Sequence, residues 1–294
     1  MASKVVDLNP LIFDRKPSIG KKCTAVISYD TFLDLEISKE YIDSRFKTII
    51  LRYGKKQVFI NTNVIRLNRF RLETDLSRSL DVKNGVNAEI KDENKVIVNS
   101  EVYEGIVIDA SGWKGKAKWV KAIEYLYEPI ESDVIEVIFD KRNKGGFSWI
   151  VPLPYGTLVG ALSYQDPEPF VPKLNKVIID KHGGAIPRTL PVMSFKPYKI
   201  GDRTGLIKTF TGGGIFGIAK LLKPLTKAIL SSDDSEYIKT YIGLAKEIKK
   251  QYTIVSALER LWNIFPLTFT LLNNKSINAY NEFDFHSMLF RIPH

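Results

Sequence analysis

Apolar residues recur along much of this chain in short runs bounded by glycine, proline or charged residues, the pattern that predicts β-strands. The run Pro10–Asp14 predicts a short buried strand. Two further runs flank Gly54, Lys55 and Lys56, which predicts a hairpin. The predicted strands after the first cover residues 48–53, 57–66, 86–90, 95–99, 105–109, 134–139, 147–151 and 157–163.

Helical periodicity dominates the last third of the chain. The segment Thr211–Ile229 opens with three glycines and continues as an apolar helix, and residues 235–262 repeat apolar positions at helical spacing. Shorter helices are predicted at Phe70–Leu80 and Val171–Asp180, and Met1–Asp7 resembles the end of a helix. Together these patterns predict an α/β fold followed by helices.

Composition narrows the function classes. With 43 Lys and Arg against 33 Asp and Glu, the chain carries a formal charge of +10, which favours an anionic partner such as a ligand or a lipid surface. The tightest basic group lacks the interleaved aromatic residues of RNA-binding surfaces, so no nucleic acid is expected as a partner. That group comprises Lys114, Lys116, Lys118 and Lys121.

The content of cysteine, histidine and long apolar runs excludes several kinds of site. Cys23 is the only cysteine and there are three histidines, so neither an internal disulfide nor a Cys- or His-rich metal site is expected. No apolar run reaches the length of about 18 residues that a spanning helix needs. We expect a cytoplasmic protein, soluble or peripheral to a membrane.

Three segments carry candidate chemistry. Asp14 ends the first predicted strand, where a Rossmann-type fold places a carboxylate on an adenosine ribose, although an aspartate there can also serve only to form a turn. Gly105–Gly112 is an apolar strand followed by small residues. In Phe147–Pro152, alternation along a strand puts Phe147 and Trp149 on one face, where they form either a binding surface or ordinary core.

A fourth segment is rich in glycine. It runs from Gly183–Pro187 through Gly201–Gly205 to Thr211–Ile215, which opens a helix. Glycines before a helix let backbone N–H groups face an anion or a polar ring edge, or they act only as a flexible cap.

These four segments, in this order, resemble the geranylgeranyl reductase family of flavoproteins, within the group built like para-hydroxybenzoate hydroxylase. The resemblance covers about residues 1–230. The family's DRKxxIGxxC stretch resembles Asp14–Cys23, and its RxxFDxxL stretch resembles Arg69–Leu76, with Glu73 in place of Asp. Its YxWxFP motif resembles Phe147–Pro152, with Phe for Tyr and Val for Phe. Its DASG and GGAIP–GDAAG–TGGGI motifs resemble Asp109–Gly112 and Gly183–Ile215.

The resemblance implies roles for individual residues. Asp14 or Arg15 would contact the adenosine part of FAD, Arg69 would lie along the cofactor, and Asp202 would meet its ribityl or pyrophosphate region. Gly205 belongs to the same GDAAG-like motif, and Gly212, Gly213 and Gly214 would approach the isoalloxazine ring. Cys23 would lie near the flavin face and help to protonate or position an alkene, or else act as a small buried apolar residue. The residues expected to line a tunnel for an isoprenoid chain are Phe147, Trp149 and Pro152.

The sequence also departs from the family pattern. No GxGxxG precedes Pro10, so we expect a member that lacks the first βα unit, either because the natural protein is longer or because it is a degenerate paralogue. Arg203 and Thr204 replace two alanines, and Arg203 either compensates for the missing loop by charge or obstructs the site by size. Lys196, Pro197 and Lys199 make the preceding segment poorly apolar for a central strand.

These observations predict an α/β fold of the FAD-linked para-hydroxybenzoate hydroxylase type. An N-terminally truncated FAD-binding domain is expected from residues 1–30, 69–119 and 194–232, a β-rich substrate domain from 31–68 and 120–193, and a helical region from 233–294.

The expected function is FAD-dependent reduction of isolated C=C bonds in geranylgeranyl or other polyprenyl chains of lipids, with NAD(P)H or a ferredoxin-like electron donor. Trp262 and Phe265 are expected to reach a membrane surface. The alternatives are a flavin-free paralogue that binds a prenyl lipid or a partner, and a flavin monooxygenase or halogenase.

Overall fold

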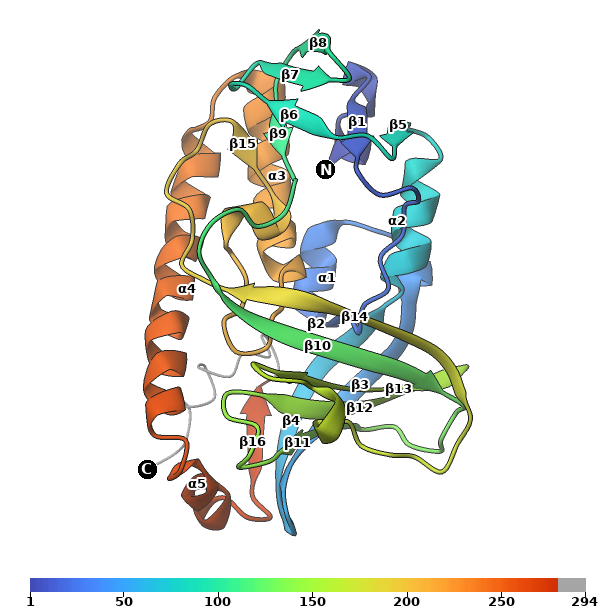
Figure 1. The fold of residues 1–294 in the computed structure, drawn as a ribbon, viewed down its shortest axis with the longest axis vertical. Coiled ribbons are helices and arrows are strands. Elements are labelled where there is room, and N and C mark those ends of the chain that lie inside the picture. The colour runs from blue at the N-terminus through green and yellow to red at the C-terminus, as the bar shows by residue number, and fades with distance from the viewer. Residues whose placement is uncertain (280–294) are drawn as a thin grey trace.

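The computed structural model describes residues 1–279, and Figure 1 shows how its parts are arranged. A large curled sheet occupies one end, two long helices run along one side, and short strands lie at the other end. No helix in residues 1–279 is both long and apolar enough to cross a bilayer. The predicted α/β character is confirmed.

The large sheet has nine strands and brings together segments far apart in the sequence. Among its described strands only the β11–β3 and β16–β4 pairs are parallel, and β2 pairs with β4 beside the main path. In sheet order the strands are β14 (Ile178–Arg188), β10 (Lys118–Tyr127), β13 (Gly156–Ser163), β12 (Phe147–Leu153), β11 (Ile135–Phe139), β3 (Ile42–Tyr53), β4 (Lys56–Leu67) and β16 (Ser276–Ala279), with β2 at Val26–Ser28.

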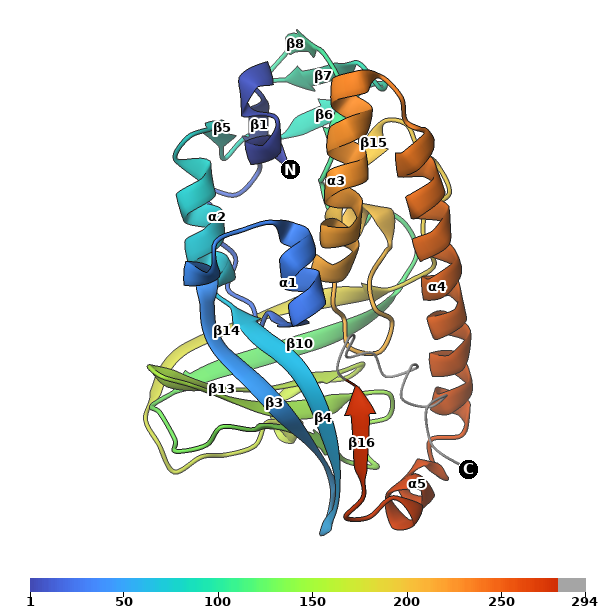
Figure 2. The same cartoon turned by 180° about the vertical axis from the view of Figure 1, so that it is seen from behind.

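The β3–β4 hairpin, seen from behind in Figure 2, forms where the sequence predicts it. Gly54, with φ of 58°, begins its two-residue loop, a position that favours glycine. Alternate residues of the two strands, such as Ile49, Val58 and Ile60, are buried in the main core. Period-two burial therefore fixes the register of this hairpin.

The other end of the molecule contains three small sheets. β1 (Leu11–Asp14) pairs in parallel with β5 (Asp81–Asn84), and β9 (Ile108–Asp109) pairs in parallel with β15 (Tyr198–Lys199). Within the described residues these two parallel pairs are not hydrogen-bonded to each other. The third sheet is an antiparallel meander of β6 (Ala88–Ile90), β7 (Lys95–Val98) and β8 (Glu101–Glu104).

The helices link the two ends. Figure 1 shows α3 and α4 running along one side of the molecule, and Leu221 and Leu225 of α3 pack with Tyr237 and Tyr241 of α4. At the far end of α4, Glu259 accepts a 3.0 Å hydrogen bond from Arg188 of β14. The α-helices are α1 (Tyr29–Leu35), α2 (Arg69–Ser77), α3 (Ile215–Ser231), α4 (Ser235–Arg260) and α5 (Phe265–Leu271), and 3-10 turns occur at Ala2–Lys4, Val6–Leu8, Lys39–Tyr41, Glu168–Phe170 and Gly201–Thr204.

Some expected elements differ from the structure. The predicted helix at Val171–Asp180 is wrong: residues 171–177 form no helix, and β14 begins at Ile178. Pro172 disfavours helical backbone in the residue before it, and the β-branched residues that follow join an outer strand beside β10. The pattern also missed α1 and β10. The end of the expected helical region, residues 280–294, lies outside the described residues.

Candidate functional site

Arg69 is the centre of a polar group that joins two segments of the chain. It is the first residue of α2, and its guanidinium forms an ion pair with Glu73 one turn later. Burial opposes the charge on Arg69, but Glu73, Cys23 and Asp202 all favour it and raise the pKa of the guanidinium above its usual value. The structure therefore brings Arg69, Cys23 and Asp202 close enough to interact, as the resemblance implies for a common site.

A close contact between the loop before Cys23 and α2 sets the position of Cys23. The Lys21 amide donates a 2.9 Å hydrogen bond to Glu73. Gly20 has φ of 103°, and a Cβ there would lie 2.7 Å from the ring of Phe70, so only glycine fits this approach. Glu73, which stands where the family has Asp, thus ties the loop to the helix. Cys23 itself is partly exposed.

The glycine-rich turn before α3 forms the other side of the group. A Cβ on Gly214 would lie 2.9 Å from Oδ1 of Asp202, so the carboxylate rests against this glycine. Gly212 has φ of 74° and packs against Ile186, whereas Gly213 has only ordinary contacts. No side chain caps the N-terminus of α3 within the described residues. The first backbone N–H groups of a helix are the ones that a polar ligand can use, and here the Asp202 carboxylate lies beside this start.

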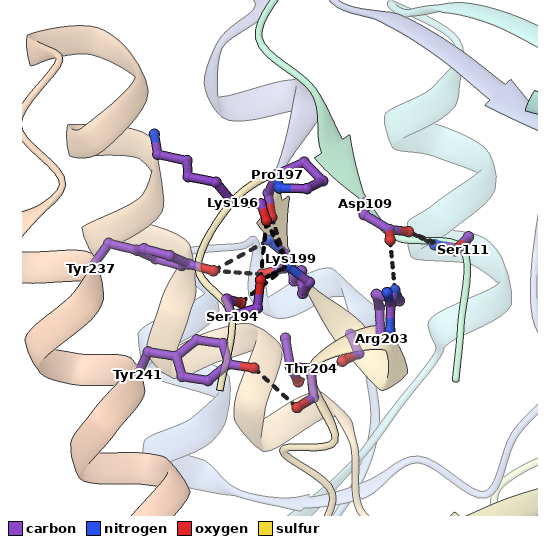
Figure 3. Close-up of polar contacts among 11 residues, drawn as sticks. Asp109, Ser111, Ser194, Lys196, Pro197, Lys199, Arg203, Thr204, Tyr237 and Tyr241 are labelled. Carbon is purple, nitrogen blue, oxygen red and sulfur yellow. Dashed lines mark hydrogen bonds and ion pairs between the residues drawn. The ribbon is translucent and has the colours of Figure 1, made fainter. Parts of the chain in front are cut away.

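A second polar group includes Arg203 and Thr204 of the 3-10 turn Gly201–Thr204 (Figure 3). Asp109 accepts hydrogen bonds from Ser111 and a 2.6 Å bond from Nε of Arg203. Burial opposes the charge on Asp109, but these donors outweigh it and hold the pKa of the carboxyl below its usual value. The charge of Arg203 is thus already partnered by this chain.

Lys199 is the other cation of this second group, and it is almost completely buried. Burial, with a smaller contribution from Arg203, lowers the pKa of its ammonium group. Its Nζ donates to oxygens of the loop that precedes β15, so a lysine stabilises this short strand from within. The acceptors are Ser194 O, Ser194 Oγ, Lys196 O and Pro197 O, at 3.0, 3.3, 3.3 and 3.0 Å.

Three predicted cofactor residues lie in other surroundings. Asp14 accepts a hydrogen bond from the Lys16 amide, as in a turn, and Arg15 is exposed. No hydrogen bond or ion pair in residues 1–279 joins either residue to Asp202. Gly205 has φ of 71°, and a Cβ there would lie 2.9 Å from the carbonyl of Leu190. Its contacts are those of a packed turn.

The predicted substrate residues divide between the two faces of β12. Phe147 and Trp149 share a face, with ring centroids 5.9 Å apart, and Phe147 stacks on Phe210 at 5.5 Å. Pro152 is at an even-numbered position of the same strand and lies on the opposite face. Phe147 and Trp149 are both packed in the main core.

Sequence reasoning missed a buried acidic group next to Trp149. Trp149 Nε1 donates a 2.6 Å hydrogen bond to Glu124, and Thr24 donates to the same carboxylate oxygen. The other oxygen of Glu124 lies 3.0 Å from Nε2 of His182. Glu124 and His182 are on neighbouring strands that are distant in sequence, so no local motif indicates them.

The described residues fit one half of FAD better than the other. The group of Arg69, Cys23, Asp202 and the glycine turn offers a guanidinium that is paired with Glu73, a thiol and a helix start without a side-chain cap, which suit the polar edge of a flavin ring. No hydrogen bond or ion pair in the described residues joins Asp14 or Arg15, the residues expected to bind the adenosine half of FAD, to this group. Arg203, which lies near the expected phosphates, already forms an ion pair with Asp109. The fit is therefore good at the ring and incomplete at the phosphates.

Comparison with known proteins gives a result at the level of the fold. The sequence matches no protein-family model and no curated protein. A geranylgeranyl bacteriochlorophyll reductase-like protein from Thermoplasma acidophilum superposes with a TM-score of 0.78 at 18% identity, covering 99% of this chain and 91% of that one. The flavin-dependent brominase Bmp2 gives a TM-score of 0.62 at 14% identity, covering 92% of this chain and 85% of that one.

A third similar structure is Klebsiella pneumoniae HpxO complexed with FAD and uric acid. It has a TM-score of 0.63 at 10% identity and covers 92% of this chain and 88% of that one. The predicted resemblance is thus confirmed for the architecture: this chain has the fold of the FAD-dependent hydroxylase-like proteins, with the reductase-like structure from Thermoplasma acidophilum among its most similar relatives.

Proposed function

We propose that this protein is a FAD-dependent reductase of isolated C=C bonds in geranylgeranyl or other polyprenyl chains of lipids. The observation that carries the proposal is that Cys23 and Asp202 lie within electrostatic range of Arg69, with Asp202 against the glycine turn of α3. The fold is shared with a reductase-like protein whose name includes geranylgeranyl and with a protein solved in complex with FAD, which supports the same proposal.

Each part of the group has a role in this proposal. Arg69 and the N–H groups at the start of α3 would hold the polar edge of the flavin, and Gly214 leaves room beside Asp202. Asp14 and Arg15 would bind the adenosine end. Bound flavin, reduced by NAD(P)H or a ferredoxin-like donor, would supply hydride. Phe147 and Trp149 would form an apolar wall that excludes water from the substrate chain, and Cys23 would orient the alkene.

A product assay tests the proposal. The purified chain is incubated with FAD, a chemical reductant and a lipid bearing geranylgeranyl chains, and the products are analysed by mass spectrometry. We expect addition of two hydrogens per double bond, with a large loss of rate in Arg69→Met and little change in the exposed-site control Lys173→Met. Incorporation of oxygen would instead identify a monooxygenase, and unchanged lipid would contradict both activities.

A second candidate is a flavin-free protein that binds a prenyl lipid or a partner. It is favoured by the two separate parallel strand pairs and by the Arg203–Asp109 ion pair near the expected phosphates. Equilibrium titration with a fluorescent polyprenyl lipid distinguishes it: this candidate predicts binding that added FAD does not change.

We also propose that the exposed side of α5 contacts a lipid surface. The expectation for Trp262 and Phe265 is wrong, because both are buried, at 3% and 8% exposure. Their neighbours Leu261, Ile264, Leu267 and Leu271 are instead about half exposed or more. Lys56 reaches α5 and hydrogen-bonds Thr270, so a basic side chain borders the apolar surface.

Vesicle sedimentation tests this contact. The wild-type chain should sediment with vesicles containing anionic lipid and be released by salt, whereas the double variant Leu267→Ser, Leu271→Ser should remain in the supernatant. Since both leucines are exposed, this variant should keep the wild-type melting temperature. Equal sedimentation of the two proteins would contradict the proposal.

A further inference from the structure

A pocket of about 480 Å³ lies near the C-terminal end of α4, and its lining residues are not those of the candidate flavin site. They belong to the start of β10, the loop between β11 and β12, the end of β13 with the residues after it, and the last turn of α4. Ligand pockets typically measure about 300–1,000 Å³, so this one has room for a small charged group. The function proposed above gives the pocket no role.

Three cationic side chains line the pocket, those of Lys118, Arg142 and Lys144. Arg142 is already paired, because its Nε donates to both oxygens of Asp140 at 3.0 Å, but its Nη1 forms no hydrogen bond within residues 1–279. Lys144 is exposed and has no hydrogen bond or ion pair in the part of the chain that the structure describes. The Lys118 side chain is 57% exposed and lies 3.5 Å from an oxygen of Glu259. All three cations can therefore still donate to a bound anion.

The carboxylate that lines the pocket belongs to Glu259, and its charge is already compensated. Arg188, whose side chain is 3% exposed, donates to one of its oxygens at 3.0 Å, and the hydroxyl of Tyr164 donates to the same oxygen. Burial raises the pKa of Tyr164 to about 12, so this hydroxyl adds no negative charge near neutral pH. Since both the carboxylate and the guanidinium of the lining have partners, the two lysines give the pocket excess positive charge, which favours an anionic ligand.

The charge and the donors of the pocket suit a phosphate monoester. Two lysines match the charge of about −1.5 to −2 that such a group carries near neutral pH, whereas a carboxylate carries only one charge. Ser163, which is 3% exposed, also lines the pocket. It accepts a 3.1 Å hydrogen bond from the amide of Gln165, and its own hydroxyl donates to no acceptor among residues 1–279. A neutral donor is therefore available beside the cations.

The pocket adjoins the exposed apolar surface around α5, the short helix that follows α4 in Figure 1. Leu261 follows two residues after Glu259, and it and Ile264 are 54% and 49% exposed. Between them, the indole of Trp262 donates to the carbonyl of Lys141 at 3.0 Å. This bond joins the segment before α5 to the loop that carries two of the three cations. A lipid with its phosphate in the pocket would thus have an apolar surface beside it for its acyl chains.

We propose that this pocket binds the phosphate monoester group of an anionic membrane lipid and thereby fixes how the protein sits on the lipid surface. This inference rests on the proposed contact of α5 with lipid and not on the proposed reductase activity. A free phosphate ion carries the same charge, but the exposed apolar residues beside the pocket favour a phosphate that bears acyl chains. Binding involves no covalent step.

Isothermal titration calorimetry at constant ionic strength tests the proposal with two probes, inorganic phosphate and dihexanoyl phosphatidic acid below its micelle concentration. We expect the lipid to bind at least about tenfold more tightly than phosphate. Both affinities should fall by about tenfold or more in the double variant Lys118→Met, Lys144→Met, because two charged donors are lost. They should be unchanged in the charge-matched control Lys173→Met, Lys176→Met, whose exposed lysines do not line the pocket. All four lysines are exposed, so both variants should keep the wild-type melting temperature.

A further double variant, Leu261→Ser, Ile264→Ser, should weaken binding of the lipid and leave binding of inorganic phosphate unchanged. Inorganic phosphate that binds the wild type as tightly as the lipid would identify a site for a free anion and overturn the assignment to a lipid. No binding of either probe, or equal losses in the two lysine double variants, would overturn the pocket itself. Because neither probe contains a C=C bond, failure of the reductase proposal would appear only in the product assay and would leave these results unchanged.

Discussion

At the scale of single residues, Lys199 shows how a buried lysine is supplied with hydrogen-bond acceptors, although burial still lowers the pKa of its ammonium group. Its ammonium group is surrounded by three backbone carbonyls and one hydroxyl, which take the place of water. Lysine has a low propensity for β-strands. Here its side chain hydrogen-bonds the backbone of the loop before β15 and so holds that loop against the strand.

Lys199→Met tests this role. Removing Nζ leaves several buried acceptors without a donor, so the free energy of unfolding should fall by about 1–3 kcal/mol. Urea denaturation measures the change, and the exposed Lys173→Met should alter stability by less than about 0.5 kcal/mol. If Lys199→Met were as stable as the wild type, the loop would not depend on this cation.

The sequence predicts part of the candidate site at this scale. Asp202, Arg69 and Cys23 were named from motifs, and the structure brings them together because Gly20 and Gly214 permit close approach. Glu124 and His182 could not be found, because their proximity depends on the register between β10 and β14. Spacing along the chain carries no information on that register.

At the scale of elements, two adjacent glycines in the turn before α3 differ in how strictly their positions require glycine. Gly212 has a positive φ and would clash with Ile186 if it carried a Cβ, whereas Gly213 has neither restriction. Gly212→Ala should therefore lower the free energy of unfolding by about 1–3 kcal/mol. Gly213→Ala should leave stability unchanged or raise it by up to about 1 kcal/mol, because alanine reduces the entropy of the unfolded chain.

Thermal unfolding of the two flavin-free variants checks this pair. The melting temperature of Gly212→Ala should be clearly lower than that of Gly213→Ala. Equal melting temperatures would show that the turn adapts, and the requirement for glycine at Gly212 would then be wrong.

Elements with strong periodicity were predictable, and those set by tertiary pairing were not. The β3–β4 hairpin and the helices α3 and α4 follow from alternation, helical spacing and glycine positions. The segment Val171–Asp180 was misassigned because its end becomes strand only by pairing with β10. In the described residues the two parallel pairs β1–β5 and β9–β15 belong to separate sheets, which periodicity along the chain does not indicate.

At the scale of the whole molecule, acid stability depends in part on Asp109. Its pKa in the folded state lies below the ordinary value of 3.8, so its contribution to stability is complete above that value. The contribution is lost as pH falls through the lower, folded value. This part of the stability should therefore be lost on acidification through the folded pKa of Asp109.

Asp109→Asn removes this contribution and leaves Arg203 without its buried partner. We expect the free energy of unfolding at neutral pH to fall by about 3 kcal/mol, and its decline between about pH 5 and pH 2 to become shallower. Denaturation curves over that pH range make the measurement, with exposed Asp81→Asn as the control. A decline as steep as in the wild type would show that Asp109 does not contribute to acid sensitivity.

Binding of FAD to the purified chain tests the central claim most directly. The absorption spectrum of FAD is recorded at increasing protein concentration for the wild type, Arg69→Met and Lys173→Met. For the wild type we expect a saturable change in the flavin bands. The affinity for FAD should be about tenfold weaker in Arg69→Met, since a hydrogen bond to a charged group contributes about 1.5 kcal/mol or more. The affinity of Lys173→Met should equal that of the wild type. A spectrum that remains that of free FAD at every protein concentration would contradict the claim that Arg69, Cys23, Asp202 and the glycine turn form a flavin site.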